Sequence, residues 1–441
     1  MLVKKRIKRW IVIALSICLL ISNFSTMPIQ AADIIQVNET DGTVSTTNHA
    51  GPQVKKIRVL KEANYLEIYW DRYVNEAEAV DISNFILKNG DTTLQLEAKG
   101  SDWTNTLYFD KNNKEVAATS ARCMARLDGD IHMSSIHFYG EIDDTKDITL
   151  EIIGDTIKDN QGRSAQSAVY TNIPYISFYT QFVTSETGIV VKGDDTVDLI
   201  SLEAAADQID VLLSKTETGI AENMEKYGCS LAVYSPHQNV YMIPEHRGGF
   251  RNDMYDVEGY GGNLYNNCVS SIAEQNIIRT RNASDWYENT MYRNENILIH
   301  EFGHCVRSVG MDLLDDPTLK SEFQAVYSHA KREGLWPNTY AIGNSDEFFA
   351  TMCTVWFNVM AEASSWNDGT RCPVNTRIEL AQYDPLTYEF FSKILPDTKL
   401  PAPWNANVPD NYKDASYDAD FTFEPEPPEN KKPLKNALFK A

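Results

Sequence analysis

The chain has 441 residues, with 62 acidic and 40 basic side chains and a formal net charge of −22 at pH 7. So acidic a chain does not suit binding to nucleic acid or to an anionic membrane surface. Its length and its 43% hydrophobic residues are sufficient for a large buried core, and we expect two or more domains.

Residues 1–32 have the features of a secretory signal peptide. Five cationic side chains precede an apolar stretch from Trp10 to Phe24, and small residues follow near Ala31. The stretch is short for a membrane span, although an uncleaved anchor is the alternative. We therefore expect a secreted, extracellular protein. Residues 33–52 are polar and turn-rich, which predicts a flexible leader.

Residues 53–176 are expected to form only β-structure. Apolar side chains alternate with other types along residues 65–70, with a period of two. Further strands and turns are expected at residues 89–90, 107–109, 148–152 and 159–162. Short strands between such turns predict an antiparallel sandwich. The stretch resembles the bacterial Ig-like modules of secreted proteins, which implies either a contact with a cell surface or cell wall, or a scaffold without a ligand.

From about residue 177 to residue 400 the pattern predicts an α+β domain, with its sheet first and most helices later. Strands are expected at residues 231–234 and 240–243, and helices at 202–213, 294–309, after 316–317, from about 345, and at 376–382. Residues 401–441 are rich in Pro, Asp, Asn and Glu, which predicts a disordered tail.

The most specific motif is H-E-x-x-H, which spans residues 300–304. On a helix, His300 and His304 lie on one face and can offer two imidazole nitrogens to one tetrahedral metal ion. Glu301 can then accept a proton from the attacking water, which is the layout of a zinc peptidase. The alternative is a buried helix whose histidines bond to carbonyl groups. The apolar residues 297–299 and the small Gly303 favour a buried helix with one polar side facing a cleft.

A catalytic zinc ion needs a third protein ligand and an open position. No histidine follows at the spacing H-E-x-x-H-x-x-G-x-x-H, which leaves the downstream carboxylates Glu322 and Glu347 as candidates. Glu322 also fits an ordinary residue at the boundary of an amphipathic helix. Glu347 opens a strongly apolar helix, where an unpaired carboxylate is costly, although it also fits a cap that pairs with Asn344. Spacing and burial favour Glu347.

Residues 339–350 read TYAIGNSDEFFA and resemble the second signature of the anthrax lethal factor-like zinc peptidases. In that family the ligand glutamate follows a Tyr-Ala pair, seven residues after the tyrosine, in an E-F-F-A-like helix. The family's first signature is an H-E-F-G-H-like helix, which residues 300–304 match. The resemblance extends over about 178–398 and includes the segments 261–262, 274–278, 355–357, 375–380 and 383–385. It does not include the toxin's substrate-binding or cell-entry domains, so toxin action is not implied.

The resemblance implies a zincin-type endopeptidase that binds one zinc ion through His300, His304 and Glu347 and acts on protein or peptide substrates. Glu301 would be the general base, and Tyr340 would donate a hydrogen bond to the oxyanion. Tyr340 also fits a packing role, because the chain has 22 tyrosines. Residues 259–267 are expected to form an edge strand for the substrate or an irregular loop.

Two other classes of function stay open. One is a zinc hydrolase of cell-wall amide bonds, and the other is a catalytically silent surface adhesin. The intact Glu301 argues against the adhesin, since a structural metal site has no use for a general base.

Six cysteines remain after the signal peptide, and none belongs to a C-x-x-C pair, so a thiolate zinc site is not expected. An oxidising compartment would permit disulfides. Cys305 and Cys353 lie on the two helices that zinc would bring together, either as a disulfide or as two buried thiols. The six are Cys123, Cys229, Cys268, Cys305, Cys353 and Cys372.

Overall fold

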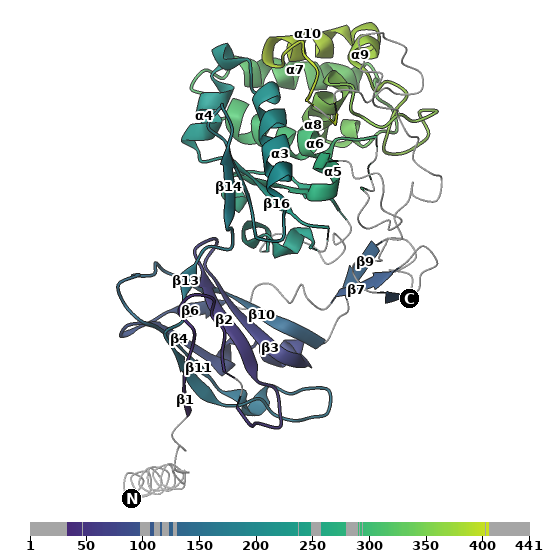
Figure 1. The fold of residues 1–441 in the computed structure, drawn as a ribbon. Coiled ribbons are helices and arrows are strands. Elements are labelled where there is room, and N and C mark those ends of the chain that lie inside the picture. Colours follow the sequence, from purple (N-terminus) through teal and green to yellow (C-terminus); the bar gives the residue numbers. More distant parts are fainter. Residues whose placement is uncertain are drawn as a thin grey trace, which may run out of the picture.

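The structure is a computed structural model that describes residues 33–45, 47–97, 106–109, 115–116, 123–126, 130–236, 238–247, 257–278, 290, 292, 294–401 and 403–404. The predicted signal peptide and residues 405–441 of the predicted tail lie outside these residues. Figure 1 shows a part built of strands below a part rich in helices. Within the described ranges, no helix is both long and apolar enough to span a bilayer.

The N-terminal part contains two five-stranded sheets. The first has the order β1 (Asp33–Gln36), β12 (Ala168–Thr171), β11 (Ile148–Ile152), β4 (Phe85–Asn89) and β5 (Thr92–Thr93). The second has the order β13 (Tyr175–Ile176), β2 (Val54–Leu60), β3 (Tyr65–Asn75), β10 (Asp130–Tyr139) and β6 (Gln95–Glu97). A separate three-stranded sheet has the order β8 (Glu115–Val116), β7 (Thr106–Phe109) and β9 (Cys123–Arg126).

One apolar core lies between the two larger sheets, so they form a sandwich. Ile57 and Ile68, which pair in register on β2 and β3, share this core with Leu87 and Leu150, which pair on β4 and β11. The predicted strands at 107–109 and 148–152 are confirmed. The sheets are not purely antiparallel as predicted, because β1 runs parallel to β12 and β13 runs parallel to β2. Membership in the Ig-like class stays a prediction.

The predicted leader and the start of the predicted tail are ordered. Asp33–Gln36 forms the edge strand β1, and Val37 is buried in the sandwich core. At the other end, Trp404 is buried in the core of the helical part. Its indole nitrogen donates to the carbonyl oxygens of Asn276 and Ile277 at 3.1 and 3.2 Å. A polar composition did not reveal these few apolar anchors, and burial of their side chains stabilises both segments.

The C-terminal part has a five-stranded sheet with helices on one face (Figure 1). Its order is β14 (Gln181–Thr184), β15 (Val190–Gly193), β16 (Ser230–Tyr234), β18 (Val269–Ala273) and β17 (Gly259–Tyr260). The three central strands are parallel, and both edge strands are antiparallel to their neighbours. The helices are α3 (Leu199–Leu212), α4 (Ile220–Lys226), α5 (Glu274–Ile278), α6 (Ile297–Cys305), α7 (Thr318–Arg332), α8 (Ser345–Trp356), α9 (Arg377–Tyr383) and α10 (Pro385–Ile394).

Five predicted helices correspond to α3, α6, α7, α8 and α9, and the strand at 231–234 is β16. The strand predicted at 240–243 is wrong, because Val240–Met242 is a 3-10 helix, η5. The side chain of Asn239 accepts a hydrogen bond from the backbone N–H of Tyr241 and starts this turn. The motif helix also ends earlier than predicted, since Val306–Met311 continues as a π-helix.

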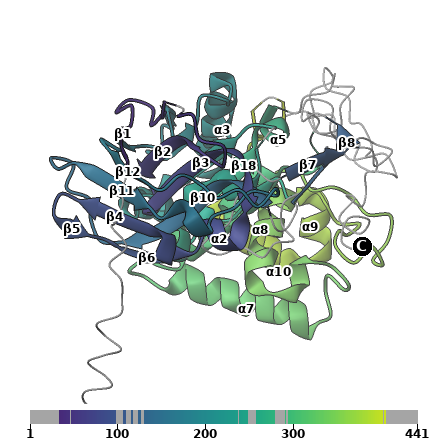
Figure 2. The same ribbon diagram turned by 90° about the horizontal axis from the view of Figure 1, so that it is seen from below.

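The sheet face opposite the helices packs on the sandwich. Leu60 and Tyr65 of the sandwich share an apolar cluster with Tyr234, Val269 and Ala273 of the C-terminal sheet. Figure 2, seen from below, shows the strands of the sandwich in front of the C-terminal part. The alternation along β3 therefore does not separate a buried face from a solvated one, because residues 65–68 are all buried.

Among the side chains that the structure describes, five cysteines are buried free thiols, namely Cys229, Cys268, Cys305, Cys353 and Cys372. Of the two alternatives for Cys305 and Cys353, the structure has the free thiols. Cys305 instead lies beside Cys229, with 3.5 Å between their sulfur atoms. Cys123 belongs to β9, and its side chain lies outside the described part of the chain.

Candidate metal centre

Helix α6 presents the motif histidines because its other sides are buried. The side chain of Asn296 caps the helix by accepting a hydrogen bond from the N–H of Ile299 at 3.0 Å. Ile297, Leu298 and Phe302 are in the core, which turns the face carrying His300 and His304 towards the cleft.

Helix α8 lies directly against α6, because a glycine is at the contact. A Cβ atom on Gly303 would be only 3.3 Å from the Cα of Ala350. The side chain of Asn344 caps α8 and accepts hydrogen bonds from the N–H groups of Asp346 and Glu347. The predicted alternative, in which Glu347 reaches back to cap the helix, does not hold, because its carboxylate turns towards α6 instead.

The three predicted ligands converge on one point. Nε2 of His300 lies 3.2 Å from Oε2 of Glu347, and Nε2 of His304 lies 3.6 Å from the same oxygen. Among the described residues, these three side chains form a group whose ligand atoms lie within 4.8 Å of one another. Zinc bonds of about 2.0–2.2 Å in a tetrahedron place neighbouring ligand atoms about 3.3–3.6 Å apart. The donor types, and the distances of both imidazole nitrogens from Oε2 of Glu347, suit a bound metal ion.

The electrostatics of the cluster favour a positive charge at this point. Burial opposes ionisation of Glu347, but hydrogen bonds from His300 and His304 outweigh it and hold the pKa of Glu347 well below its usual range. Burial also opposes protonation of His300, but Glu347 and Glu301 outweigh it and raise the pKa of His300 to about 9. A bound cation satisfies the same demand for positive charge.

Glu301 lies in the cleft beside the cluster. Its side chain passes over the edge strand, where a Cβ atom on Gly259 would be 2.7 Å from the Cγ of Glu301. Burial raises the pKa of Glu301, although His300 and His304 oppose this change. A carboxylate with a raised pKa is a better proton acceptor, as a general base requires.

Tyr340 reaches the cluster from the segment before α8. Its backbone N–H donates to the carbonyl oxygen of Thr370 at 2.9 Å, and its hydroxyl donates to Oε1 of Glu347 at 3.1 Å. Burial and the nearby carboxylate of Glu347 raise the pKa of Tyr340 above its ordinary value of 10.0, so the phenol keeps the proton that it donates. Tyr340 is 54% exposed, which leaves its ring accessible from the cleft.

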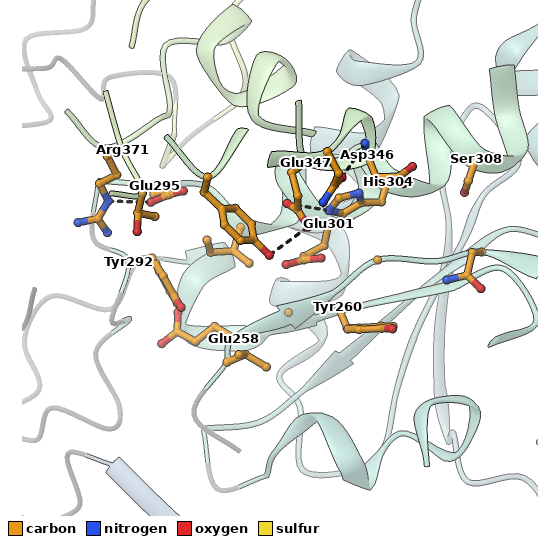
Figure 3. A pocket seen from close by; sticks show the side chains of 18 of the residues that line it. Glu258, Tyr260, Tyr292, Glu295, Glu301, His304, Ser308, Asp346, Glu347 and Arg371 are labelled. Carbon is orange, nitrogen blue, oxygen red and sulfur yellow. Dashed lines mark hydrogen bonds and ion pairs between the residues drawn. The ribbon is translucent and has the colours of Figure 1, made fainter. Parts of the chain in front are cut away.

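A cleft of about 570 Å³ runs across the site. Tyr260 of β17 and the following residue Gly261 line it together with Glu301, His304 and Tyr340. Figure 3 shows Tyr260 below Glu301 and Glu347. A Cβ atom on Gly261 would be 2.6 Å from the Cβ of His304, so only glycine allows this close approach. Glu295 and Arg371 form an ion pair at one end, with Nε and Oε2 3.2 Å apart.

The structure brings His300, Glu301, His304, Tyr340 and Glu347 together at this cleft. It does not bring Glu322 there, because that carboxylate pairs with Lys393 on the surface at 2.9 Å. Sequence reasoning missed the cleft residues Glu258, Tyr292, Glu295, Ser308 and Arg371. Only Glu295 carried a local signal, since it directly precedes the capping residue of the motif helix.

Comparisons with known proteins do not assign the chain to a family. No family model matches it, and no curated protein matches it. Among solved structures, the N-terminal part of the bacterial S-layer protein SbsC is 15% identical with a TM-score of 0.20, and the match covers 34% of this chain and 29% of that chain. The S-layer protein rSbsC(31-844) is 14% identical with a TM-score of 0.19, over 34% of this chain and 17% of that chain. TM-scores this low define no shared fold.

Proposed function

We propose that this protein is a secreted zinc-dependent endopeptidase of the lethal factor-like class. The observation that carries the proposal is the convergence of His300, His304 and Glu347 on one point, with Glu301 in the adjoining cleft. A structural zinc site needs four ligands and no base, whereas three protein ligands beside a carboxylate are the layout of a hydrolytic site.

A zinc ion held by these three residues supplies a Lewis acid and a nucleophilic water of lowered pKa. Glu301 accepts the proton of the attacking water and delivers it to the leaving amine. The hydroxyl of Tyr340 donates a hydrogen bond to the oxyanion that develops on the scissile carbonyl. This assignment requires the hydroxyl to move from Oε1 of Glu347, its acceptor in the structure, when substrate binds.

The cleft suits an extended peptide. Within the described residues, strand β17 pairs only with β18 and is the last strand of its sheet, at the cleft wall. A peptide can add to such an edge through main-chain hydrogen bonds. Gly259 and Gly261 keep this edge close to Glu301 and His304. Main-chain donors and acceptors of a strand edge can pair with a peptide of any sequence, which supports a peptidase.

The N-terminal sandwich belongs to the same proposal as an Ig-like module that contacts a cell surface or cell wall. The alternative chemistry, hydrolysis of cell-wall amides, would use the same metal cluster on another substrate. Purified cell wall and a mixed peptide library, offered to the same preparation, separate the two. A catalytically silent adhesin would cleave neither the cell wall nor the peptides.

The full secreted chain, loaded with zinc, is incubated with the peptide library, and the products are identified by mass spectrometry. Cleavage at internal bonds that a chelator abolishes, and that zinc restores, supports the proposal. The Glu301→Gln variant is the control for a contaminating peptidase. Zinc-loaded protein that cleaves cell wall but no peptide contradicts the endopeptidase assignment.

A further inference from the structure

A fully buried ion pair joins the sandwich to the C-terminal part. Glu67 of β3 is 0% exposed, and Arg247 follows the 3-10 helix η6 (Pro244–His246) and is 4% exposed. Their Oε1 and Nη1 atoms are 2.6 Å apart. Arg58 of β2 contacts the other carboxylate oxygen at 2.5 Å. Breaking a buried pair leaves an uncompensated charge, so this contact strongly favours one arrangement of the two parts.

Arg247 is fixed from several directions. Its Nε atom donates to the carbonyl oxygen of Tyr241 at 3.2 Å, and its Nη2 atom donates to that of Met242 at 3.0 Å. A third nitrogen, Nη1, donates to the hydroxyl of Ser135 on β10 at 3.3 Å. The guanidinium group also lies over the ring of Tyr65, 5.3 Å from its centroid. The planar fork of arginine can make all these contacts at once.

The residue next to Arg247 contacts the wall of the cleft. The ring of His246 packs edge-on against that of Tyr260, with centroids 5.2 Å apart. Tyr260 belongs to β17, and its neighbour Gly259 touches Glu301. His246 is 1% exposed, so a displacement of the segment 240–247 would reach β17 through direct packing.

An apolar contact also connects the sandwich to the strand next to β17. Ile243 belongs to the apolar cluster that includes Leu60 of the sandwich and Ala273 of β18. Strand β18 is the neighbour of β17, with Gly259 opposite Ile272. The sandwich therefore supports the cleft edge through both a charged and an apolar contact.

We propose that the sandwich positions the substrate-binding edge of the cleft through the contacts Glu67–Arg247 and His246–Tyr260. Glu67 and Arg247 are positioning residues, since they act through β17 and touch no reacting group. The part of this inference that concerns substrate rests on the proposed peptidase function, whereas the part that concerns the order of β17 does not.

The test compares Glu67→Gln with Asp159→Asn in the full chain. Asp159 is a matched control, because it is another buried carboxylate of the sandwich that pairs with arginines, Arg163 at 2.7 Å and Arg72 at 3.8 Å, and it has no ion pair with Arg247. Glu67→Gln is expected to raise KM for a peptide about fivefold to tenfold with kcat within about twofold. The reason is that a displaced β17 weakens binding of the substrate and of the transition state equally. Asp159→Asn is expected to leave both constants at the parent values. Equal KM changes in the two variants would overturn the inference.

Hydrogen exchange gives a readout that does not depend on activity. Exchange at residues 259–261 is expected to accelerate about tenfold or more in Glu67→Gln and to stay unchanged in Asp159→Asn. Unchanged exchange in Glu67→Gln overturns the positioning role. If the parent protein cleaves no peptide, the proposed function fails, and the exchange comparison still decides the role of the sandwich.

Arg247→Lys is the second test variant, to be used if Glu67→Gln does not fold. Lysine keeps the charge but cannot hold both carbonyl oxygens and the carboxylate. We expect the same two changes, KM and exchange at residues 259–261, in the same direction and of smaller size. Parent values for both in a folded Arg247→Lys protein count against the proposal.

Discussion

Two carboxylates of this protein, one buried and one at the edge of the cleft, are neutralised in different ways. Glu67 lies between two guanidinium groups, which carry a permanent positive charge. Glu347 lies between two imidazole rings, which carry a charge only when protonated. The first carboxylate therefore has fixed partners, and the second has partners that can give up their protons to a metal ion.

The difference separates a structural centre from a chemical one. At the interface, loss of one partner of the Glu67–Arg247 ion pair would leave a buried charge without compensation. The ion pair therefore holds the sandwich and the C-terminal part in one arrangement. At the cleft, the imidazoles become zinc ligands once they give up their protons, and the carboxylate is already in its ligating form. Each prediction below tests one side of this contrast.

The largest effect is expected from Glu347→Ala. This change removes one of three ligands, so we expect bound zinc to fall from about one per chain to near none, and peptide hydrolysis to be lost with it. Metal analysis of dialysed protein measures the first quantity. Glu322→Ala is the matched control and should keep its zinc, because Glu322 pairs with Lys393 instead. Zinc loss in the control and zinc retention in Glu347→Ala would reverse the assignment.

Glu301→Gln is expected to lower kcat by about 10²–10⁴-fold, the range for loss of a positioned proton acceptor. Glutamine keeps the shape of the side chain against Gly259, so zinc content should equal that of the parent. Steady-state kinetics on the metal-loaded variant give the answer. Activity within about tenfold of the parent excludes Glu301 as the general base.

Tyr340→Phe tests which of two roles the hydroxyl has. If it stabilises the oxyanion, kcat should fall by about 10²–10³-fold with little change in KM. If its hydrogen bond to Glu347 mainly orients that ligand, zinc affinity should fall by about 10–100-fold instead. We expect the first result. Competition with a zinc chelator, measured beside the kinetics, distinguishes the two, and a parent-like kcat rules out the oxyanion role.

The sequence allowed prediction of the metal cluster because each part of it is local. The two histidines are one helical turn apart, and Glu347 follows a strong cap, Asn344. The hairpin turn at 89–90 was predictable for the same reason, since Gly90 has a φ of 57°, which glycine adopts readily. Local geometry depends on neighbours in sequence.

The interface was not predictable because its parts are far apart in the chain. Glu67 lies on a strand whose alternation gives its face but not what covers that face. Arg247 follows a segment predicted as a strand, which the side chain of Asn239 turns into a 3-10 helix. Nothing in either stretch indicates that the two meet, since the contact depends on the packing of one part on the other.

The smallest expected effect concerns stability and pH. Burial alone would raise the pKa of Glu67, but Arg58 and Arg247 outweigh it and lower this pKa to about 2, from an ordinary value of 4.5. Because the pKa is lower in the folded protein, the stabilisation is complete above pH 4.5 and is lost as the pH falls towards 2. Glu67→Gln lacks this dependence.

We expect Glu67→Gln to lower the free energy of unfolding by about 3 kcal/mol at pH 7, which lowers Tm by roughly 5–10 °C. Its Tm difference from the parent should stay constant down to about pH 5 and shrink at lower pH. Metal-free protein is used, so that zinc release does not contribute. Ser134→Ala is the control, because it loses a hydrogen bond from Trp70 but no titrating group, and its Tm difference should not depend on pH. If the Tm of Glu67→Gln is as far below that of the parent at pH 3 as at pH 7, the ion pair does not supply the stability. The permanent charge of its partners would then no longer distinguish Glu67 from Glu347.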